Sequence, residues 1–231
     1  KDTLIVAIGT AMSRLTGLLR VVVFGIIIGQ TALADAFDGA NNSPNSIYEL
    51  LVGGLLAASL VPLFTRFAED DDDEATNAVV SVSLIVLAIA TAVAVAAAPL
   101  IFRLFSLQVS PLVDPEQFRH VGTVMSRIFL IQIFFYGLTA IGSALLNSRR
   151  HFFAAAWSPV LSNVITITLL LIIPFTRDGT PGLETVLSDH TFFWLFTMSA
   201  TAGVMAMGLV LIPALKRADI AIRFTPNFGH P

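Results

Sequence analysis

Two arginines lie inside a long apolar stretch, six residues apart along the chain. Arg14 and Arg20 fall within residues 3–29, which are otherwise almost wholly apolar. A charge at the centre of a membrane-spanning helix costs about 2.5–3.5 kcal/mol on insertion scales, so two charges there need a compensating role. A guanidinium stays charged, and its fork binds two phosphate oxygens at once. The pair is therefore typical of a site for an anionic substrate or of a buried ion pair.

Both arginines fall on one side of the expected helix. At about 100° per residue, the polar and small residues lie within a sector of roughly 120°. These residues are Thr10, Ser13, Arg14, Gly17 and Arg20. The two arginines are then about 9 Å apart along the helix axis and can point into one cavity. A structural ion pair with Asp35, Asp38 or Glu49 is the alternative, and a resting pair that opens for an anion would satisfy both interpretations.

The composition indicates an all-α integral membrane protein. The chain is 55% hydrophobic and only 13% charged, whereas soluble chains carry about 25% charged residues. It has no cysteine, which excludes disulfides, thiolate nucleophiles and cysteine-based metal sites. No HExxH, GxSxG or GxGD motif and no nucleotide-binding glycine loop occurs, and the four histidines fall at expected loops or helix ends. We therefore expect no enzyme activity, no metal, no cofactor and no nucleic-acid partner.

Six apolar segments are long enough to span a membrane, which takes about 20 residues. They lie near residues 4–29, 32–67, 78–105, 118–147, 153–175 and 191–215. The second is too long for one straight helix, and we expect it to be broken near 42–45 because Pro44 removes a backbone donor. A broken helix beside a charged helix is frequent in transporters. A proline kink that serves only packing is the alternative.

Lysine and arginine between the spans predict the orientation. One side collects Lys1, Arg66, Arg149, Arg150, Lys216, Arg217 and Arg223, and the other side collects Arg103, Arg119 and Arg177. Seven basic residues against three favour the first side, with the amino terminus, as cytoplasmic. The acidic run at 69–74 is interpreted as a solvated loop.

Further polar and small residues follow helical spacing inside the later spans. Gln132, Tyr136, Thr139, Ser143 and Asn147 share one face of the fourth span. In the fifth, Ser158, Ser162 and Thr166 are typical of helix–helix contacts, whereas Asn163 is the better functional candidate because its amide both donates and accepts. Gly25 and Gly29 form a GxxxG pair and predict a close-packing face.

Several motifs, in order, resemble the MurJ (MviN) family of lipid II flippases. They are SRLTGLLR at 13–20, ADAF at 34–37, NSPN at 42–45, LVP at 60–62, GSALLN at 142–147 and FFAAAWSPVLSN at 152–163, followed by IPALKR at 212–217 and FTPNF at 224–228. The resemblance implies the multidrug/oligosaccharidyl-lipid/polysaccharide exporter superfamily, whose fold has two six-helix lobes. The chain would then be the amino-terminal six-transmembrane-helix bundle, one lobe of a two-lobed exporter fold, with the carboxy-terminal lobe absent.

The resemblance also implies a substrate and a site. The substrate would be lipid II, the undecaprenyl-pyrophosphate-linked peptidoglycan precursor, flipped across the bacterial cytoplasmic membrane. Arg14 and Arg20 would contact its pyrophosphate, Asp35 would be the acid of the second helix, and Asn163 would be a cavity residue. The expected substrate-binding set is completed by Ser13, Asn45 and Glu49. The expected partners are this lipid, the membrane lipids and the missing lobe.

Two alternatives stay open. The sequence has Val21, Tyr48-Glu49, Met207 and Leu211 where the family often has other residues, which leaves room for an exporter of another polyprenyl-pyrophosphate-linked glycan. A non-transporting membrane scaffold, with permanently paired arginines, is the second alternative.

Overall fold

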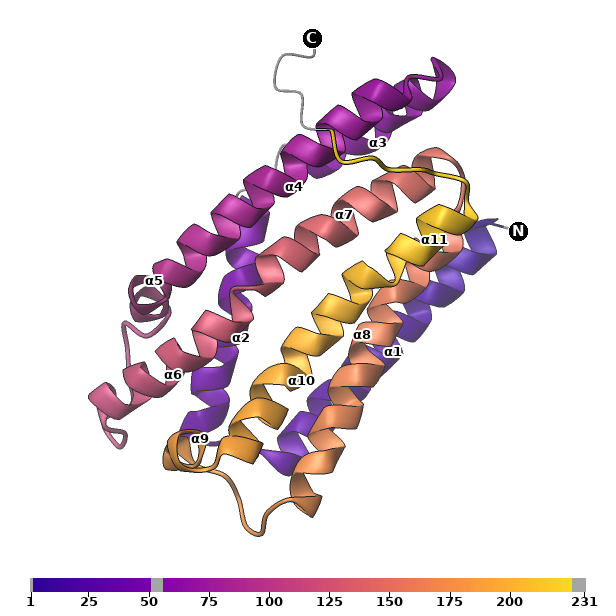
Figure 1. Ribbon diagram of the computed structural model, residues 1–231. Coiled ribbons are helices and arrows are strands. Elements are labelled where there is room, and N and C mark those ends of the chain that lie inside the picture. Colours follow the sequence, from indigo (N-terminus) through magenta and orange to yellow (C-terminus); the bar gives the residue numbers. More distant parts are fainter. Residues whose placement is uncertain (1, 51–55, 226–231) are drawn as a thin grey trace.

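The computed structural model describes residues 2–50 and 56–225, without the side chains of residues 56–59. Within these ranges every regular element is a helix, as the composition predicts (Figure 1). The longer helices are α1 (Asp2–Ile27), α2 (Ala32–Tyr48), α3 (Leu56–Glu69), α4 (Asp73–Ala96), α6 (Pro115–Phe129), α7 (Gln132–Ser148), α8 (Phe152–Ile172) and α10 (His190–Leu209). The short ones are α5 (Ala98–Phe105), η2 (Ile173–Phe175), α9 (Leu183–Ser188) and α11 (Leu211–Arg217).

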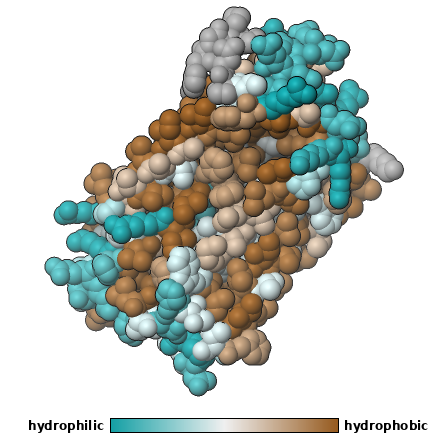
Figure 2. Space-filling model, in the orientation of Figure 1, coloured by the Kyte–Doolittle hydropathy of each residue, from teal (hydrophilic) through white to brown (hydrophobic). Residues whose placement is uncertain are grey.

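Five stretches of helix are long and apolar enough to cross a membrane. They are Asp2–Ile27, Asp73–Ala96, Pro115–Ser148, Phe152–Phe175 and His190–Arg217. Figure 2 shows hydrophobic surface between two hydrophilic ends, as a protein embedded in a bilayer requires. Five of the six expected spans overlap with these stretches, and the expected 78–105 begins and ends later than Asp73–Ala96. The other, 32–67, overlaps with none of them, because α2 has only 17 residues and residues 51–55 lie outside the described part of the chain.

Helix α2 continues through residues 42–45, where the sequence predicts a break. Pro44 has no N–H to bond the carbonyl oxygen of Ala40, but Ser43 Oγ donates to that oxygen at 2.8 Å. Side chains that satisfy freed carbonyl groups allow prolines inside membrane helices. The predicted position of the break is therefore wrong, and α2 ends at Tyr48.

Helix α8 uses the same arrangement. Pro159 lies inside it, and the carbonyl oxygen of Ala155, which Pro159 cannot bond, accepts from Ser158 Oγ at 3.2 Å. Both serines are buried. The Ser-Pro pair thus keeps two helices continuous at positions where proline alone would interrupt the hydrogen bonds.

The helices are arranged as a row with α2 on one side of it (Figure 1). Helix α1 packs mainly against α8, α8 against α10, α10 against α7, and α7 against α3 and α4. Helix α2 packs against α6, α5 and α7. The start of α1, the α3–α4 and α7–α8 turns and the end of α11 gather at one end, which we call the basic end. Its described basic residues are Arg66, Arg149, Arg150, Lys216, Arg217 and Arg223, whereas Lys1 lies outside the described residues.

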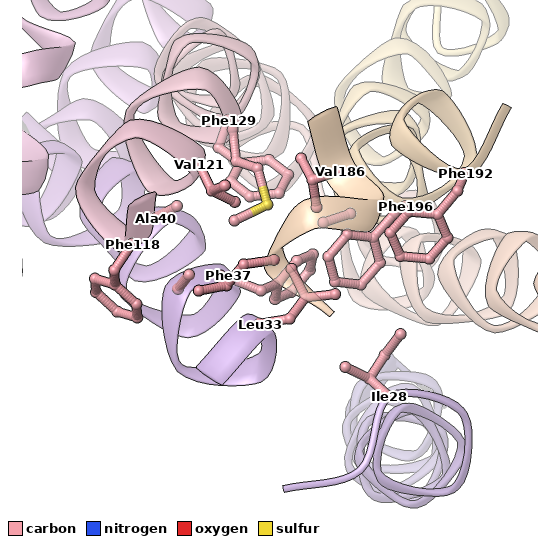
Figure 3. Packing of buried hydrophobic residues seen from close by; sticks show 14 of the residues in the cluster. Ile28, Leu33, Phe37, Ala40, Phe118, Val121, Phe129, Val186, Phe192 and Phe196 are labelled. Carbon is pink, nitrogen blue, oxygen red and sulfur yellow. The ribbon is translucent and has the colours of Figure 1, made fainter. Parts of the chain in front are cut away.

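An aromatic core holds α1 and α2 together at the opposite end. The Phe37 ring of α2 packs 4.9 Å from Phe24 of α1, 5.1 Å from Phe129 of α6 and 4.6 Å from Phe196 of α10, measured between ring centroids. Ile28, at the end of α1, is fully buried in the same cluster (Figure 3). This packing fixes the point from which α1 and α2 diverge.

Residues 218–225, after α11, lie against the start of α4. The backbone N–H of Arg223 donates to Asn77 Oδ1 at 2.7 Å, and that of Thr225 donates to Ser81 Oγ at 2.9 Å. Asn77 and Ser81 are both buried. Residues 226–228 of the FTPNF motif lie outside the described residues.

Candidate functional site

Helices α1 and α2 meet at the aromatic core and diverge towards the basic end (Figure 1). A pocket of about 210 Å³ lies where they begin to separate. Its lining comprises Arg20, Val21 and Phe24 of α1, Phe37, Asp38, Asn41 and Asn42 of α2, Thr166 and Leu170 of α8, and Ala200 of α10. We call this region the α1–α2 opening.

One side of α2 is polar along its whole length. Its exposed residues are Asp35, Asp38, Asn42 and Asn45, and Glu49 follows directly after the helix. Spacings of three, four, three and four residues place these side chains on one face. The opposite face buries Leu33, Phe37 and Ala40. An exposed face without a single apolar residue suits water rather than lipid. We call this face the α2 polar stripe.

Arg14 and Arg20 reach the surface of α1 with exposed side chains. Among residues 2–50 and 56–225, no carboxylate lies within 4.0 Å of either guanidinium. Arg20 of α1 and Asp38 of α2 line the same pocket. The permanent ion pair considered above is thus not formed in the described structure, and both guanidinium groups can accept an anion.

Asn163 has a different surrounding from the one expected for a cavity residue. It is buried, and its amide Nδ2 donates to the carbonyl oxygen of Ser13 at 3.1 Å and to Thr16 Oγ1 at 3.0 Å. Gly17 lies beside the same amide, because a Cβ at this position would be 3.6 Å from Nδ2. Asn163 and Ser13 therefore join α8 to α1 and hold the helix that carries both arginines.

The remaining expected residues lie on α2. Asn45 Nδ2 donates to Glu49 Oε1 at 2.9 Å, one helical turn away, and both side chains are exposed. Asp35 is exposed in the first turn of α2, where a carboxylate is favourable because of the partial positive charge of the helix start. The structure thus brings Asp35, Asn45 and Glu49 onto the same stripe as Asp38 and Asn42, which line the pocket.

A buried polar network behind the pocket was not identified from the sequence as one site. Gln132, fully buried at the start of α7, donates from Nε2 to Asn41 Oδ1 at 3.4 Å and to Thr201 Oγ1 at 3.2 Å. Tyr136 OH donates to Gln132 Oε1 at 3.4 Å. The polar face predicted on the fourth span contains Gln132 and Tyr136, but the sequence does not indicate that Asn41 and Thr201 meet them.

The close-packing glycine differs from the predicted one. A Cβ on Gly25 would meet nothing within 4 Å, and Gly29 lies in the α1–α2 turn with a positive φ of 72°. The GxxxG prediction is therefore wrong. Gly9 makes the close approach instead, because its Cβ would lie 2.9 Å from the carbonyl oxygen of Ala156 on α8.

The pocket of the opening offers one guanidinium group, that of Arg20, and one carboxylate, that of Asp38. The amides of Asn41 and Asn42 and the hydroxyl of Thr166 can donate or accept hydrogen bonds there. No group of three or more His, Asp or Glu side chains within the described ranges is placed to hold a metal ion.

Comparison with known proteins finds a matching family and several relatives. The model of the family "Lipid II flippase MurJ" matches residues 24–231. A probable lipid II flippase MurJ of Rhizobium tropici is 30% identical over 228 residues, which cover 94% of this chain and 40% of that protein. A lipid II flippase MurJ of Burkholderia cenocepacia is 29% identical over 216 residues, with coverages of 91% and 39%. The chain thus spans about 40% of the length of these curated relatives.

Proposed function

Because the chain belongs to the lipid II flippase MurJ family, we propose that it forms the amino-terminal lobe of a flippase for lipid II. In this proposal the α1–α2 opening binds the pyrophosphate of the undecaprenyl-linked peptidoglycan precursor. The precursor then crosses the cytoplasmic membrane for cell-wall synthesis.

One observation carries the proposal. Arg14 and Arg20 are exposed on α1 without a carboxylate within 4.0 Å among the described residues, and Arg20 lines the pocket together with Asp38 and Asn42 of the α2 polar stripe. A pyrophosphate carries several oxygens on two adjacent phosphorus atoms, and two guanidinium forks about 9 Å apart along one helix can bind it in succession as it moves. The carboxylates of Asp35 and Asp38 repel a bound pyrophosphate, so they weaken its binding and favour its release.

The remaining helices complete the lobe in this proposal. We take α2 and α3 in series as the sixth crossing, which completes a six-helix lobe. The opening then faces a second lobe, since alternating access in such transporters rocks one lobe against the other around a shared site. That the chain spans about 40% of its relatives supports a partner lobe elsewhere in the complete protein.

We propose that the basic end lies in the cytoplasm, together with the amino terminus. Its described basic residues outnumber Arg103, Arg119 and Arg177 at the opposite end, and lysine and arginine favour the cytoplasmic side of a membrane. Because α1 and α2 diverge towards this end (Figure 1), a lipid headgroup enters between them from the cytoplasmic leaflet in this proposal.

Arg14 and Arg20 also bear on the two alternatives, a scaffold and an exporter of another glycan. A scaffold requires paired arginines, whereas neither arginine has a carboxylate within 4.0 Å in the described ranges. An exporter of another polyprenyl-pyrophosphate glycan would use the same pyrophosphate contacts, so the sugar part decides. Native mass spectrometry of the complete protein with lipid II and with other polyprenyl-pyrophosphate glycans separates these two substrates.

The test replaces both arginines in the complete protein. We expect Arg14→Ala with Arg20→Ala to abolish growth of a strain depleted of its own flippase. Each charged hydrogen bond is worth about 1.5–3 kcal/mol, so affinity for lipid II should fall about tenfold or more per residue.

Arg127→Ala is the matched control, because Arg127 is also an exposed arginine of a spanning helix but lies on α6 and does not line the pocket. Protein levels in the membrane are compared for all variants. Normal growth of the doubly substituted strain at normal protein level would contradict the proposal.

A further inference from the structure

A second concave surface lies at the basic end, on a different side of α8 from the α1–α2 opening. It is a groove of about 860 Å³ between the start of α1, α8 and the α10–α11 region. None of its lining residues lines the pocket of the opening. Ser162, Asn163 and Thr166 of α8 are buried against α1 and α10, whereas Trp157, Leu161 and Val164 line the groove.

The rim of the groove is basic. Arg150, His151 and Arg217 line it, with Asp2 as its single acidic residue. Within the described ranges, no carboxylate lies within 4.0 Å of Arg150 or Arg217. Arg150 has a positive φ of 62°, which is uncommon for a residue other than glycine, and its N–H bonds the carbonyl oxygen of Asn147. The tight α7–α8 turn therefore fixes an arginine backbone at the rim.

The start of α8 adds to this positive charge. Phe152, Phe153 and Ala154, which form its first turn, line the groove. His151 precedes them and makes no side-chain hydrogen bond to that turn. The N–H groups at a helix start carry a partial positive charge and favour an anion, so they act in the same direction as the two arginines.

Below the rim the groove is apolar. Phe153, 62% exposed, stacks on Trp157 with ring centroids 5.6 Å apart, and aromatic side chains of this kind are enriched at the level of lipid headgroups. Leu161 and Val164 continue the lining towards the middle of the spanning region. From Phe152 to Val164 the helix rises about 18 Å, which exceeds half of the roughly 30 Å hydrocarbon thickness of a bilayer.

We propose that this groove binds an anionic glycerophospholipid of the membrane. The phosphate lies between Arg150, Arg217 and the start of α8, and one acyl chain lies along Trp157, Leu161 and Val164. The charge of the rim selects an anionic over a zwitterionic headgroup, and the apolar floor selects a lipid over a free phosphate. This inference does not depend on the pyrophosphate role of the opening, because the two surfaces share no lining residue.

The experiment measures lipids retained by the full chain in native mass spectrometry, after delipidation and addition of phosphatidylglycerol or phosphatidylcholine. Arg150→Gln with Arg217→Gln should reduce retained phosphatidylglycerol at least fivefold and leave phosphatidylcholine unchanged. Arg66→Gln with Arg223→Gln removes two charges from the same end without touching the groove lining, and this control should retain phosphatidylglycerol as the unmodified chain does.

Two further measurements test the apolar floor of the groove and the choice of lipid over free phosphate. Val164→Trp places a bulky side chain on the apolar floor at a 46% exposed position, and it should also reduce retained phosphatidylglycerol although no charge changes. Inorganic phosphate at tens of millimolar should not displace the lipid. The proposal would be overturned if the groove variant and its control retained equal amounts of phosphatidylglycerol, if the unmodified chain retained as much phosphatidylcholine as phosphatidylglycerol, or if phosphate displaced the lipid. Thermal melting checks that every variant is folded.

Discussion

The two helices that border the α1–α2 opening are built in opposite ways. Helix α1 packs mainly against α8 and leaves large apolar side chains exposed, among them Leu15 at 60%, Leu18 at 63% and Val21 at 62%. Helix α2 packs against three other helices and exposes only polar residues. The exposed side chains of α2 are thus suited to contact with water. Those of α1 are mostly apolar and suited to contact with lipid or further protein, except for Arg14 and Arg20.

This difference indicates a division of roles. Helix α2 is held by the surrounding core and presents a fixed polar wall. Helix α1 is positioned along most of its length by a seam with α8 and near its end by the aromatic core, so the location of Arg14 depends most on Gly9, Asn163 and the backbone they contact. Substitutions at the contact between α1 and α8 should therefore displace the arginines without altering α2.

The largest expected effect comes from Gly9→Ala on the seam. The added Cβ would lie 2.9 Å from the backbone carbonyl oxygen of Ala156, so α1 and α8 must separate. Overpacking of this kind costs about 1–3 kcal/mol, and we expect a lower melting temperature and weaker lipid II binding. Gly25→Ala is the control on the same helix, because a Cβ there meets nothing within 4 Å and alanine favours helix. Equal destabilisation by both substitutions would contradict the role of the α1–α8 contact at Gly9 in positioning α1.

An intermediate effect is expected from Asn163→Ala. The substitution removes the two hydrogen bonds from Nδ2 to Ser13 and Thr16, and such bonds between membrane helices average about 0.6 kcal/mol each. We therefore expect a loss of roughly 1 kcal/mol in unfolding measurements. Asn45→Ala removes only the exposed bond to Glu49 and should stay within about 0.5 kcal/mol. A change in substrate affinity with unchanged stability for Asn163→Ala would instead make it a direct substrate contact.

The smallest effect concerns the proline inside α2. Ser43→Ala leaves the carbonyl oxygen of Ala40 without its 2.8 Å partner and should cost about 0.5–1 kcal/mol. In the Pro44→Ala background the restored N–H bonds that oxygen, so Ser43→Ala should then be nearly neutral. A double-mutant cycle on the melting of the purified protein measures the difference. Additive effects of the two substitutions would show that Ser43 does not replace the missing donor.

The sequence predicts those parts of the site that depend on residue type and local spacing. Two arginines in an apolar stretch must reach a polar surrounding, and Asp35, Asp38, Asn42, Asn45 and Glu49 follow helical spacing that can be read from the chain. The all-helical fold follows from apolar segments of spanning length in the same way.

The parts that fail depend on how helices rotate against one another. The sequence predicts Asn163 as a cavity residue, whereas the contact of α8 with α1 places its amide against the carbonyl oxygen of Ser13. Gly25 belongs to a GxxxG pattern yet has open space beside it, whereas Gly9 makes the close approach. Pro44 was expected to break its helix because the rule for proline ignores the neighbouring hydroxyl of Ser43.

The central claim is that α2 presents a wet wall of a pyrophosphate site. The chain contains no cysteine, so a cysteine introduced into it is the only one among residues 1–231. Asn42→Cys lies on the α2 polar stripe, and Val86→Cys, at a 54% exposed position of α4, is the lipid-facing control. In the complete protein in membranes, we predict that a charged thiol reagent labels Asn42→Cys and not Val86→Cys, and that lipid II protects Asn42→Cys. Absence of labelling at Asn42→Cys, or labelling that lipid II does not reduce, would contradict the account.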